Sequence, residues 1–598
     1  MKKLLLAVFL SCSFCLFGQS FDTLSIRAAI EQQMAAYPES TLQDIYKSFY
    51  QDRFGPGHMI SDTASARSYL MRESLEMSEA SAVYYEPTGS EGRFVRVYLS
   101  AVSDGLITAD QLLDAFVRSA NMVQETESDW ETEWRSVVDI ITKHDIQVNG
   151  IKEDAPSLEK ASRNHQAVHH SRVYNTVYHP HYRIVERAIF EKELMPLINS
   201  GCFHKRYTLK QVVVLSRHNI RSPLSGRSSR LQRITPHEWC HWSSAPGELS
   251  LRGGALETMM GQYFRKWLVS EGLMQENEIP AEGTMRFYAN SLQRTIATAQ
   301  YFSSGLLPVA NVRIEHHCEV GKMDSVFAPQ ITDDNEAFKA LAQQQIAAMG
   351  GEKELVGIGD KMTENYKTLE RVLDMDQSKA CLEGDTCGFR TDDTHVYLVK
   401  YREPGMGGSL RLACQTADAL VLQYYEEPDA VKAAFGDTLT WEDWESISAI
   451  KDWYGDVLFT APAVACQVAR PLLRTMLEEL QNDSRRFTFL CGHDSNIGSV
   501  LAALDAEDYS LPQTIEKKTP IGCKLVIEKW ENAEGQLFAS LNLVYQSTEQ
   551  LRNMTLLVLE DPPMIFPIHL KGLSANTDGL YPYKALVDRF VEKVEEKK

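Results

Sequence analysis

The chain has 598 residues, which is too long for one ordinary hydrophobic core, so two or three domains are expected. Its apolar content of 44% and charged content of 24% are those of a soluble globular protein. The formal net charge of −20 argues against nucleic acid as a partner, and it means that an anionic substrate needs a locally basic pocket.

Residues 1–20 are predicted to be a secretory signal peptide. A lysine-containing start, residues 1–3, precedes an apolar run over 4–18, and small residues follow for cleavage. The run is too short to span a membrane, and no later segment is long and apolar enough to do so. We therefore expect a periplasmic or secreted protein. A lipid anchor on Cys12 or Cys15 is the alternative, although the residues before each cysteine fit that signal poorly.

Of the 11 cysteines, two lie in the expected signal peptide and nine remain: Cys202, Cys240, Cys318, Cys381, Cys387, Cys414, Cys466, Cys491 and Cys523. Because nine is odd, at least one has no partner within the chain. An oxidising compartment allows disulfides, and Cys381 with Cys387 is the best local pair. Cys491 lies in an apolar stretch and is expected to be a small buried side chain.

Residues 21–200 are predicted to form a first, mainly helical domain. It contains a cluster of histidines: His165, His169, His170, His179 and His181, with His58 earlier in the chain. His165 and His169 are four residues apart, so on a helix they share one face, as metal ligands can. No cysteine or carboxylate completes a ligand set at convincing spacing, and nearby tyrosines favour buried or capped histidines. We expect no metal here, and the sequence does not predict what this domain does.

The most informative stretch follows a proposed junction at Asn199–Lys205. The apolar run 212–215 predicts a buried strand, and Arg217 and Arg221 flank His218 directly after it. Ligands of open α/β sheets bind outside the carboxyl ends of strands. Two guanidinium groups suit a phosphate, and the imidazole between them can attack phosphorus. The alternative is a basic surface loop.

Helical patterns follow in chain order: a start at Thr235-Pro236, then 255–271, 291–302 with Asn290 or Ser291 as cap, 332–349 including its capping residues, 369–373, 417–425 and 460–480. Arg294 lies in a first turn, where a cation is unfavourable for the helix unless it faces an anion. Glu426 and Glu427 follow the helix 417–425. They either form a solvated helix end or contact substrate.

A second apolar strand is predicted over 486–491, and it ends in Gly492-His493-Asp494-Ser495-Asn496 before a helix over 497–504. His493 could complete a phosphate site, and Asp494 could give a proton to the departing alcohol. The alternative is a glycine turn in which Asp494 only caps the helix.

The remaining chain predicts a β-hairpin over 523–529 and 537–546, two strands over 555–560 and 565–570, and a closing helix over 583–594.

The string Arg217-His218-x-x-Arg221-x-Pro223, with the distant His493-Asp494, resembles the histidine acid phosphatases. Four segments are similar to the branch that contains the periplasmic glucose-1-phosphatases, a sister of the phytases: 288–300, 492–497, 519–522 and 544–553. The resemblance covers about 207–590 and does not reach the first domain.

The resemblance implies an α/β fold for residues 207–598, with a central mixed sheet, flanking helices and a helical cap inserted after the first strand. It also implies roles for single residues. His218 would be the nucleophile that forms a phosphohistidine, Asp494 the proton donor, and Glu426 a residue on the substrate side. The phosphate would be bound by Arg217, Arg221, Arg294 and His493. No metal and no organic cofactor are implied.

The chain departs from the family pattern at three places. Asn219 stands where the common motif has glycine, as it does in the glucose-1-phosphatase branch. Cysteines that form bridges in relatives are missing near Ile279, Asn311, Leu573 and Tyr581. The loop 224–233 is basic here, with Arg227, Arg230 and Arg233, and this favours a more highly charged substrate.

The main expectation is therefore a secreted phosphomonoesterase that acts on sugar phosphates such as glucose 1-phosphate. A phytase acting on inositol phosphates is the alternative within the family. An alternative of another class is a surface-binding protein that uses the phosphatase fold as a carrier for the first domain. That alternative requires a broken site, whereas all the implied catalytic positions are intact in the sequence. A phosphoryl mutase of the wider superfamily is disfavoured, because the signal peptide places the chain where the usual metabolites of such enzymes are scarce. A bifunctional enzyme with a catalytic first domain is a further alternative.

Overall fold

The computed structural model describes residues 106, 107, 111 and 195–595, except 225–229, 277, 334 and 560. The predicted signal peptide, almost all of the predicted first domain and its histidine cluster lie outside the described residues. The chain divides into two compact units between Arg206 and Tyr207. Helix α10 (Met195–Arg206) covers the stretch expected as a junction, and β1 (Tyr207–Arg217) follows it directly.

The second unit is built on a mixed sheet with the strand order β2-β5-β1-β6-β7-β8, and β9 also pairs with β7. Beside β1, its strands are β2 (Met285–Ala289), β5 (Phe487–Gly492), β6 (Lys524–Asn532), β7 (Leu537–Tyr545), β8 (Met564–Pro567) and β9 (Tyr581–Pro582). Strand β5 pairs parallel with both β1 and β2, whereas β6 pairs antiparallel with β1. The carboxyl ends of three parallel strands therefore meet at one edge of the sheet.

Helices cover both faces of this sheet. They are α11 (Leu251–Ser270), α12 (Gln293–Leu306), α20 (Pro462–Leu480), α21 (Asp494–Ala503) and α23 (Tyr583–Glu595). On one face, Val213 and Leu215 of β1 pack in a core shared with α20, α21 and α23. On the other face, Phe302 of α12 stacks on Phe489 of β5 with ring centroids 4.1 Å apart. Strands buried on both faces read as continuous apolar runs, which is why β1 and β5 were recognisable in the sequence.

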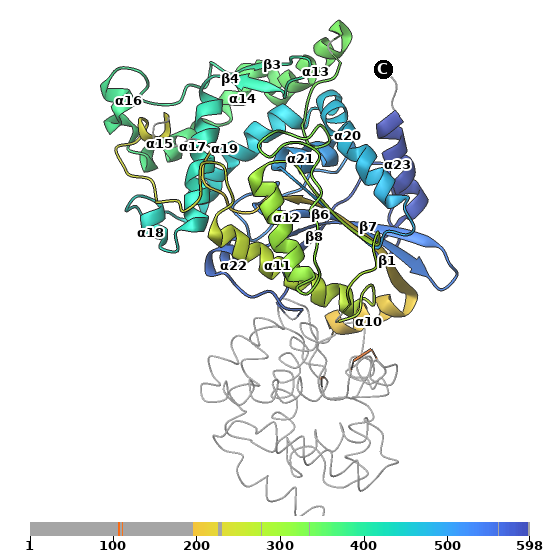
Figure 1. Cartoon of the computed structure of the whole chain (residues 1–598). Coiled ribbons are helices and arrows are strands. Elements are labelled where there is room, and N and C mark those ends of the chain that lie inside the picture. Colours follow the sequence, from red (N-terminus) through yellow and green to blue (C-terminus); the bar gives the residue numbers. More distant parts are fainter. Residues whose placement is uncertain are drawn as a thin grey trace, which may run out of the picture. The chain divides into compact units, whose positions relative to one another are not determined.

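A helical insert lies between α12 and α20. It comprises α13 (Glu336–Met349), α14 (Glu354–Asp360), α15 (Thr363–Val372), α16 (Lys379–Leu382), α17 (Ser409–Glu426), α18 (Ala430–Ala433) and α19 (Trp441–Phe459), with a short hairpin of β3 (His395–Tyr397) and β4 (Gly405–Gly407). Leu369, Leu420 and Ile447 lie in its apolar core. The insert comes after the first strand, as predicted, and follows β2 and α12 in the chain. Figure 1 shows most of these helices gathered to one side of the sheet.

The insert carries the disulfide Cys381–Cys387, as predicted. Cys491 is buried in β5 and free, also as predicted. Within the described ranges, no helix is long and apolar enough to cross a membrane.

Several predicted elements are wrong. No helix starts at Thr235-Pro236, because the backbone there is held by tertiary contacts: Cys240 N donates to Gln423 Oε1 of α17 at 2.7 Å. No strand covers 555–559, the described part of this stretch, where Val558 N donates to Asp561 O. Helix α19, which packs α17 against the rest of the insert, was not predicted.

The start of two helices also differs from prediction. Helix α11 begins at Leu251, four residues earlier than expected, because Ser250 caps it and accepts from Gly253 N. Helix α12 begins after Leu292, and neither Asn290 nor Ser291 caps it. Asn290 instead bonds to His493, which is part of the site described next.

Candidate active site

The two motif segments meet at the carboxyl edge of the sheet. In the parallel pairing of β1 with β5, Arg217 lies opposite Gly492, so His218 and His493 leave neighbouring strand ends. His218 N donates to Gly492 O at 3.1 Å. The rings of His218 and His493 are 5.5 Å apart between centroids. The topology therefore brings together residues that are 275 positions apart (493 − 218) in the sequence.

His218 is buried and presents one defined ring nitrogen. Its Nδ1 lies 2.9 Å from the carbonyl oxygen of Asn219. Because a carbonyl only accepts, Nδ1 carries the proton and Nε2 keeps its lone pair. Burial lowers the pKa of His218 well below its ordinary value, and the charges of Arg294 and Arg221 lower it further. Both effects favour the neutral imidazole, which is the form that a nucleophile needs.

Three arginines surround this imidazole, and their charge is only partly balanced. Arg221 Nη2 donates to Asp418 Oδ2 of α17 at 2.9 Å, and Arg294 Nη1 reaches Gly247 O at 3.4 Å. The Nε atoms of Arg217, Arg221 and Arg294 are buried without a hydrogen-bond partner. Burial and the charge of Arg221 lower the pKa of Arg294 to about 10. Unpaired guanidinium donors that repel one another form a site for an anion such as phosphate.

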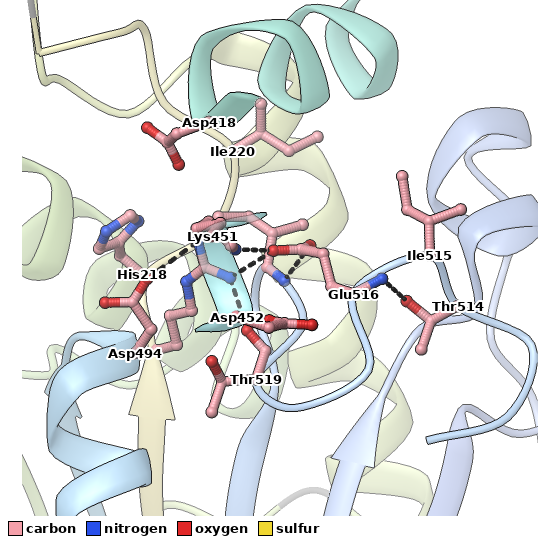
Figure 2. Close-up of polar contacts among 12 residues, drawn as sticks. His218, Ile220, Asp418, Lys451, Asp452, Asp494, Thr514, Ile515, Glu516 and Thr519 are labelled. Atoms are coloured by element: carbon pink, nitrogen blue, oxygen red, sulfur yellow. Dashed lines mark hydrogen bonds and ion pairs between the residues drawn. The ribbon is translucent and has the colours of Figure 1, made fainter. Parts of the chain in front are cut away.

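Arg217 is bound by Glu516, a buried carboxylate that the sequence does not predict. Its Nη1 donates to Glu516 Oε1 at 2.8 Å, and its Nη2 lies 3.5 Å from Asp494 Oδ2. Glu516 also pairs with Lys451 of α19 and accepts from Ile521 N at 2.8 Å. Figure 2 shows Asp494 and His218 on one side of this network and Glu516 on the other. Glu516 therefore fixes the guanidinium that faces Asp494.

Asp494 is not the N-cap of α21. It is the first residue of this helix, and His493 is the N-cap. The side chain of Asp494 is 42% exposed and lines a cavity. Burial raises the pKa of Asp494, but the charges of Arg217 and Lys451 outweigh burial and lower that pKa below its ordinary value. A bound phosphate adds negative charge and raises the pKa of Asp494. Asp494 can therefore carry a proton in acid once an anionic substrate is bound.

His493 is buried and fixed by Asn290. Asn290 Nδ2 donates to His493 Nε2 at 2.7 Å, and Asn290 Oδ1 accepts from Asp324 N at 2.9 Å. Because Nε2 accepts, the ring proton of His493 is on Nδ1. Burial and the charge of Arg294 lower the pKa of His493, and the charge of Asp494 opposes this. A neutral imidazole of this kind can donate one hydrogen bond to a phosphate oxygen.

A cavity of about 370 Å³ opens beside Arg221 and Asp494 and is walled by α17, α19 and α21. Its charged lining consists of six acidic residues (Asp418, Asp452, Asp456, Asp494, Glu507 and Asp508) and three basic ones (Arg221, Lys451 and Lys518). Burial raises the pKa of Asp452 to about 7 and that of Asp456 to about 6. The space next to the anion site is therefore acidic.

Glu426 does not line this cavity. Its carboxyl accepts from Ser250 Oγ at 2.7 Å, at the start of α11, and burial raises its pKa. The predicted substrate contact of Glu426 therefore remains a prediction. Glu403, between β3 and β4, was missed. Its carboxyl lies close enough to Asp494 and Arg294 for their charges to act on it: burial and Asp494 raise its pKa, and Arg294 lowers it. Nothing near Glu403 in the sequence indicates a site residue, because the β3–β4 hairpin lies far from both motifs.

Among the described residues, no group of three His, Cys, Asp or Glu side chains could hold a metal ion.

An α/β sheet that gathers two histidines, three arginines and an aspartate at its carboxyl edge is suited to transferring a phosphoryl group, which is the chemistry of a phosphoric monoester hydrolase. The family model for the histidine phosphatase superfamily (branch 2) matches residues 208–379 and 415–548. The chain belongs to this family.

Curated relatives and solved structures support this assignment. Glucose-1-phosphatase of Salmonella typhimurium is 40% identical over 382 residues, which are 63% of this chain and 90% of that protein. Glucose-1-phosphatase of Providencia rettgeri is 38% identical over 377 residues, or 62% of this chain and 88% of that protein. The structure of Hafnia alvei phytase in complex with tartrate has a TM-score of 0.60 at 25% identity and covers 65% of this chain and 98% of that one.

Proposed function

We propose that this protein hydrolyses sugar phosphates such as glucose 1-phosphate through a phosphohistidine on His218. The observation that carries the proposal is the set of unpaired, buried guanidinium donors around a neutral imidazole. Arg217, Arg221, Arg294 and His493 bind the phosphoryl oxygens, and Asp494 is the proton donor. The expected signal peptide supports a periplasmic or secreted location.

The reaction has two steps. In the first, His218 Nε2 attacks phosphorus, the bond between phosphorus and the ester oxygen breaks, and Asp494 gives its proton to the departing alcohol. In the second, Asp494 takes a proton from water, the resulting hydroxide attacks phosphorus, and the bond to Nε2 breaks. The arginines stabilise the negative charge that spreads over the phosphoryl oxygens in both steps.

Two observations favour a monophosphate sugar over an inositol polyphosphate. At a pH where Asp452 and Asp456 are ionised, the cavity beside the anion site carries more acidic than basic side chains, and these repel further phosphate groups. Arg233, one of the arginines expected to attract a highly charged substrate, is paired with Glu383 at 2.8 Å and with Asp385 at 3.6 Å. The phytase alternative rests on the phytase relatives. The binding-protein alternative is weakened by a site in which all proposed catalytic groups lie together.

We expect the purified protein to prefer glucose 1-phosphate to inositol hexakisphosphate, most clearly near pH 7, where Asp456 and Asp452 ionise. The preference in kcat/KM should be about tenfold or more, because like charges brought together cost several kcal/mol. Initial rates on both substrates measure it, beside an aryl phosphate as a general probe. A preference for the inositol phosphate contradicts the sugar-phosphate assignment but not the chemistry. Inactivity on all three contradicts the enzyme itself.

The alkaline limb of the pH profile should depend on Glu516. Its negative charge partly offsets Arg217 and Lys451, both of which lower the pKa of Asp494. Glu516→Gln removes this offset, so the pKa of Asp494 falls further and its proton is lost at lower pH. We expect the alkaline limb of kcat to move down by about one pH unit. A profile of kcat against pH measures the shift, and an unchanged limb with a lower melting temperature would leave Glu516 a purely structural residue.

The first domain is proposed to be a separate, mainly helical unit over residues 21–200. That its histidine cluster holds no metal stays a prediction, and a metal or phosphate site there or a second activity is the alternative.

A further inference from the structure

Asn219, which stands where the common motif has glycine, is part of a buried polar chain beneath the nucleophile. Asn219 Nδ2 donates to Glu257 Oε2 of α11 at 2.8 Å. Glu257 Oε1 forms an ion pair with Lys524 Nζ of β6 at 2.7 Å, and both side chains are fully buried. Lys524 Nζ also donates to Gly522 O at 2.9 Å and to Ser216 Oγ at 3.1 Å. The chain thus joins the residue after His218 to a helix on one side and a strand on the other.

The surrounding backbone is shaped to admit this chain. Gly522 has a φ of +69°, and a Cβ on it would lie 2.6 Å from Asn219 Nδ2. Gly253 of α11 lets Ile220 approach closely, since a Cβ there would lie 2.4 Å from Ile220 O. Asn219 Oδ1 accepts from Ile220 N at 2.8 Å, so both ends of the amide are used. The N–H of the peptide unit that follows Asn219 is therefore fixed by the Asn219 side chain, which is itself bound to Glu257.

That peptide unit carries the carbonyl that accepts from His218 Nδ1. Its orientation decides which ring nitrogen of His218 is protonated and where Nε2 points. A buried ion pair is costly to desolvate, and its contribution to stability alone is small or negative unless its geometry is good. A fully buried Lys–Glu pair beside the catalytic loop therefore needs a reason beyond stability.

We propose that Asn219, Glu257 and Lys524 form a positioning set that holds the Asn219 carbonyl against His218 and so presents Nε2 to phosphorus. Asn219 acts on the imidazole through its own backbone, and Glu257 and Lys524 act through Asn219. None of the three lines the cavity beside the anion site. This inference rests on the proposed function, because the role of the three residues is to position His218 for its attack on phosphorus.

The principal test is Asn219→Gly in the full-length protein, which restores the residue of the common motif without adding bulk. We expect kcat on glucose 1-phosphate to fall about tenfold, because small displacements of a reacting group cost up to about a hundredfold. The inhibition constant of inorganic phosphate should change less than about twofold, since the arginines that bind the phosphate are untouched. Nitrogen NMR of the imidazole should show a mixture of ring tautomers for His218.

Glu257→Gln and the double variant Asn219→Gly/Glu257→Gln complete a thermodynamic cycle. If Glu257 acts through Asn219, Glu257→Gln lowers kcat in the wild-type background and has no further effect in the Asn219→Gly background. The matched control is Glu479→Gln, which breaks the buried pair with Arg286 (2.8 Å) near the opposite end of the strands. It should lower the melting temperature and leave kcat unchanged.

A kcat of Asn219→Gly within twofold of wild type, with an unmixed tautomer, overturns the inference, as does an equal effect of Glu257→Gln in both backgrounds. Should Glu257→Gln fail to fold, Asn219→Gly alone decides. His218→Ala separates this inference from the proposed function. If His218→Ala is active, the proposed function fails; if it is inactive while Asn219→Gly turns over like wild type, only the positioning set fails.

Discussion

His218→Ala should reduce turnover of glucose 1-phosphate by about 10⁴-fold or more, because it removes the proposed nucleophile. Phosphate binding should survive, since the three arginines keep their unpaired Nε donors. The fold should also survive, because the imidazole makes one hydrogen bond to its own loop. The variant therefore separates chemistry from binding.

The measurement is a single-turnover assay with labelled substrate, quenched in alkali, where a phosphohistidine persists. Wild type should carry label on the protein within the first turnover, and His218→Ala should carry none. His395→Ala, which changes an exposed histidine in the helical insert, is the control and should behave as wild type. Label on the protein in His218→Ala would place the covalent intermediate elsewhere and contradict the proposed nucleophile.

The strands that carry the site were predictable because their physics is local. Strands β1 and β5 are buried on both faces, so their sequences are continuous apolar runs, and each ends where charged residues begin. Parallel strands then place those residues at one edge without any knowledge of the rest of the fold. The meeting of His218 with His493 follows from this rule. Their roles in catalysis rest on the family resemblance and on the tests proposed above.

The supporting residues were not predictable, because their signals are not local. Glu516 lies in an irregular segment before β6, and nothing near it in the sequence marks it as the partner of Arg217. Asp418 and Lys451 belong to helices of the insert whose apolar patterns indicate only a core. Asn219 was noted as a departure from the common motif, but its partners come from α11 and β6, and only the fold brings them together.

Two wrong predictions have the same origin. Thr235-Pro236 has the local signature of a helix start, yet tertiary contacts with α17 hold the backbone in turns. The stretch 555–560 has apolar residues in the number that a strand needs, yet Leu556 and Leu559 are exposed and no neighbouring strand pairs with it among the described residues. In both cases the local preference is weaker than the contacts that the surrounding chain makes available.

Asp494→Asn should lower kcat on glucose 1-phosphate by about 10²–10⁴-fold, the usual worth of a positioned general acid. The amide keeps the shape of the carboxyl but has no proton to give to a sugar alkoxide. The loss of negative charge beside Arg217 should leave phosphate binding as tight or tighter, because their 3.5 Å ion pair no longer competes with the anion. The alkaline limb of the kcat profile should disappear with the group that titrates. Asp508→Asn, which neutralises another acid of the same cavity, is the control and should keep that limb.

The leaving group decides how much of this loss is seen. Nitrophenolate, the group that leaves from the aryl ester nitrophenyl phosphate, needs no proton. Formation of the phosphohistidine from this ester should therefore stay fast in Asp494→Asn. Hydrolysis of the phosphohistidine should be slow in this variant, because it lacks the carboxylate that takes a proton from water in the second step. We therefore expect a burst of nitrophenol equal to the amount of enzyme, followed by slow turnover. A variant that releases glucose and nitrophenol at wild-type rates would show that Asp494 has no part in proton transfer. Equal losses on both esters without a burst would instead limit its role to shaping the charge around Arg217.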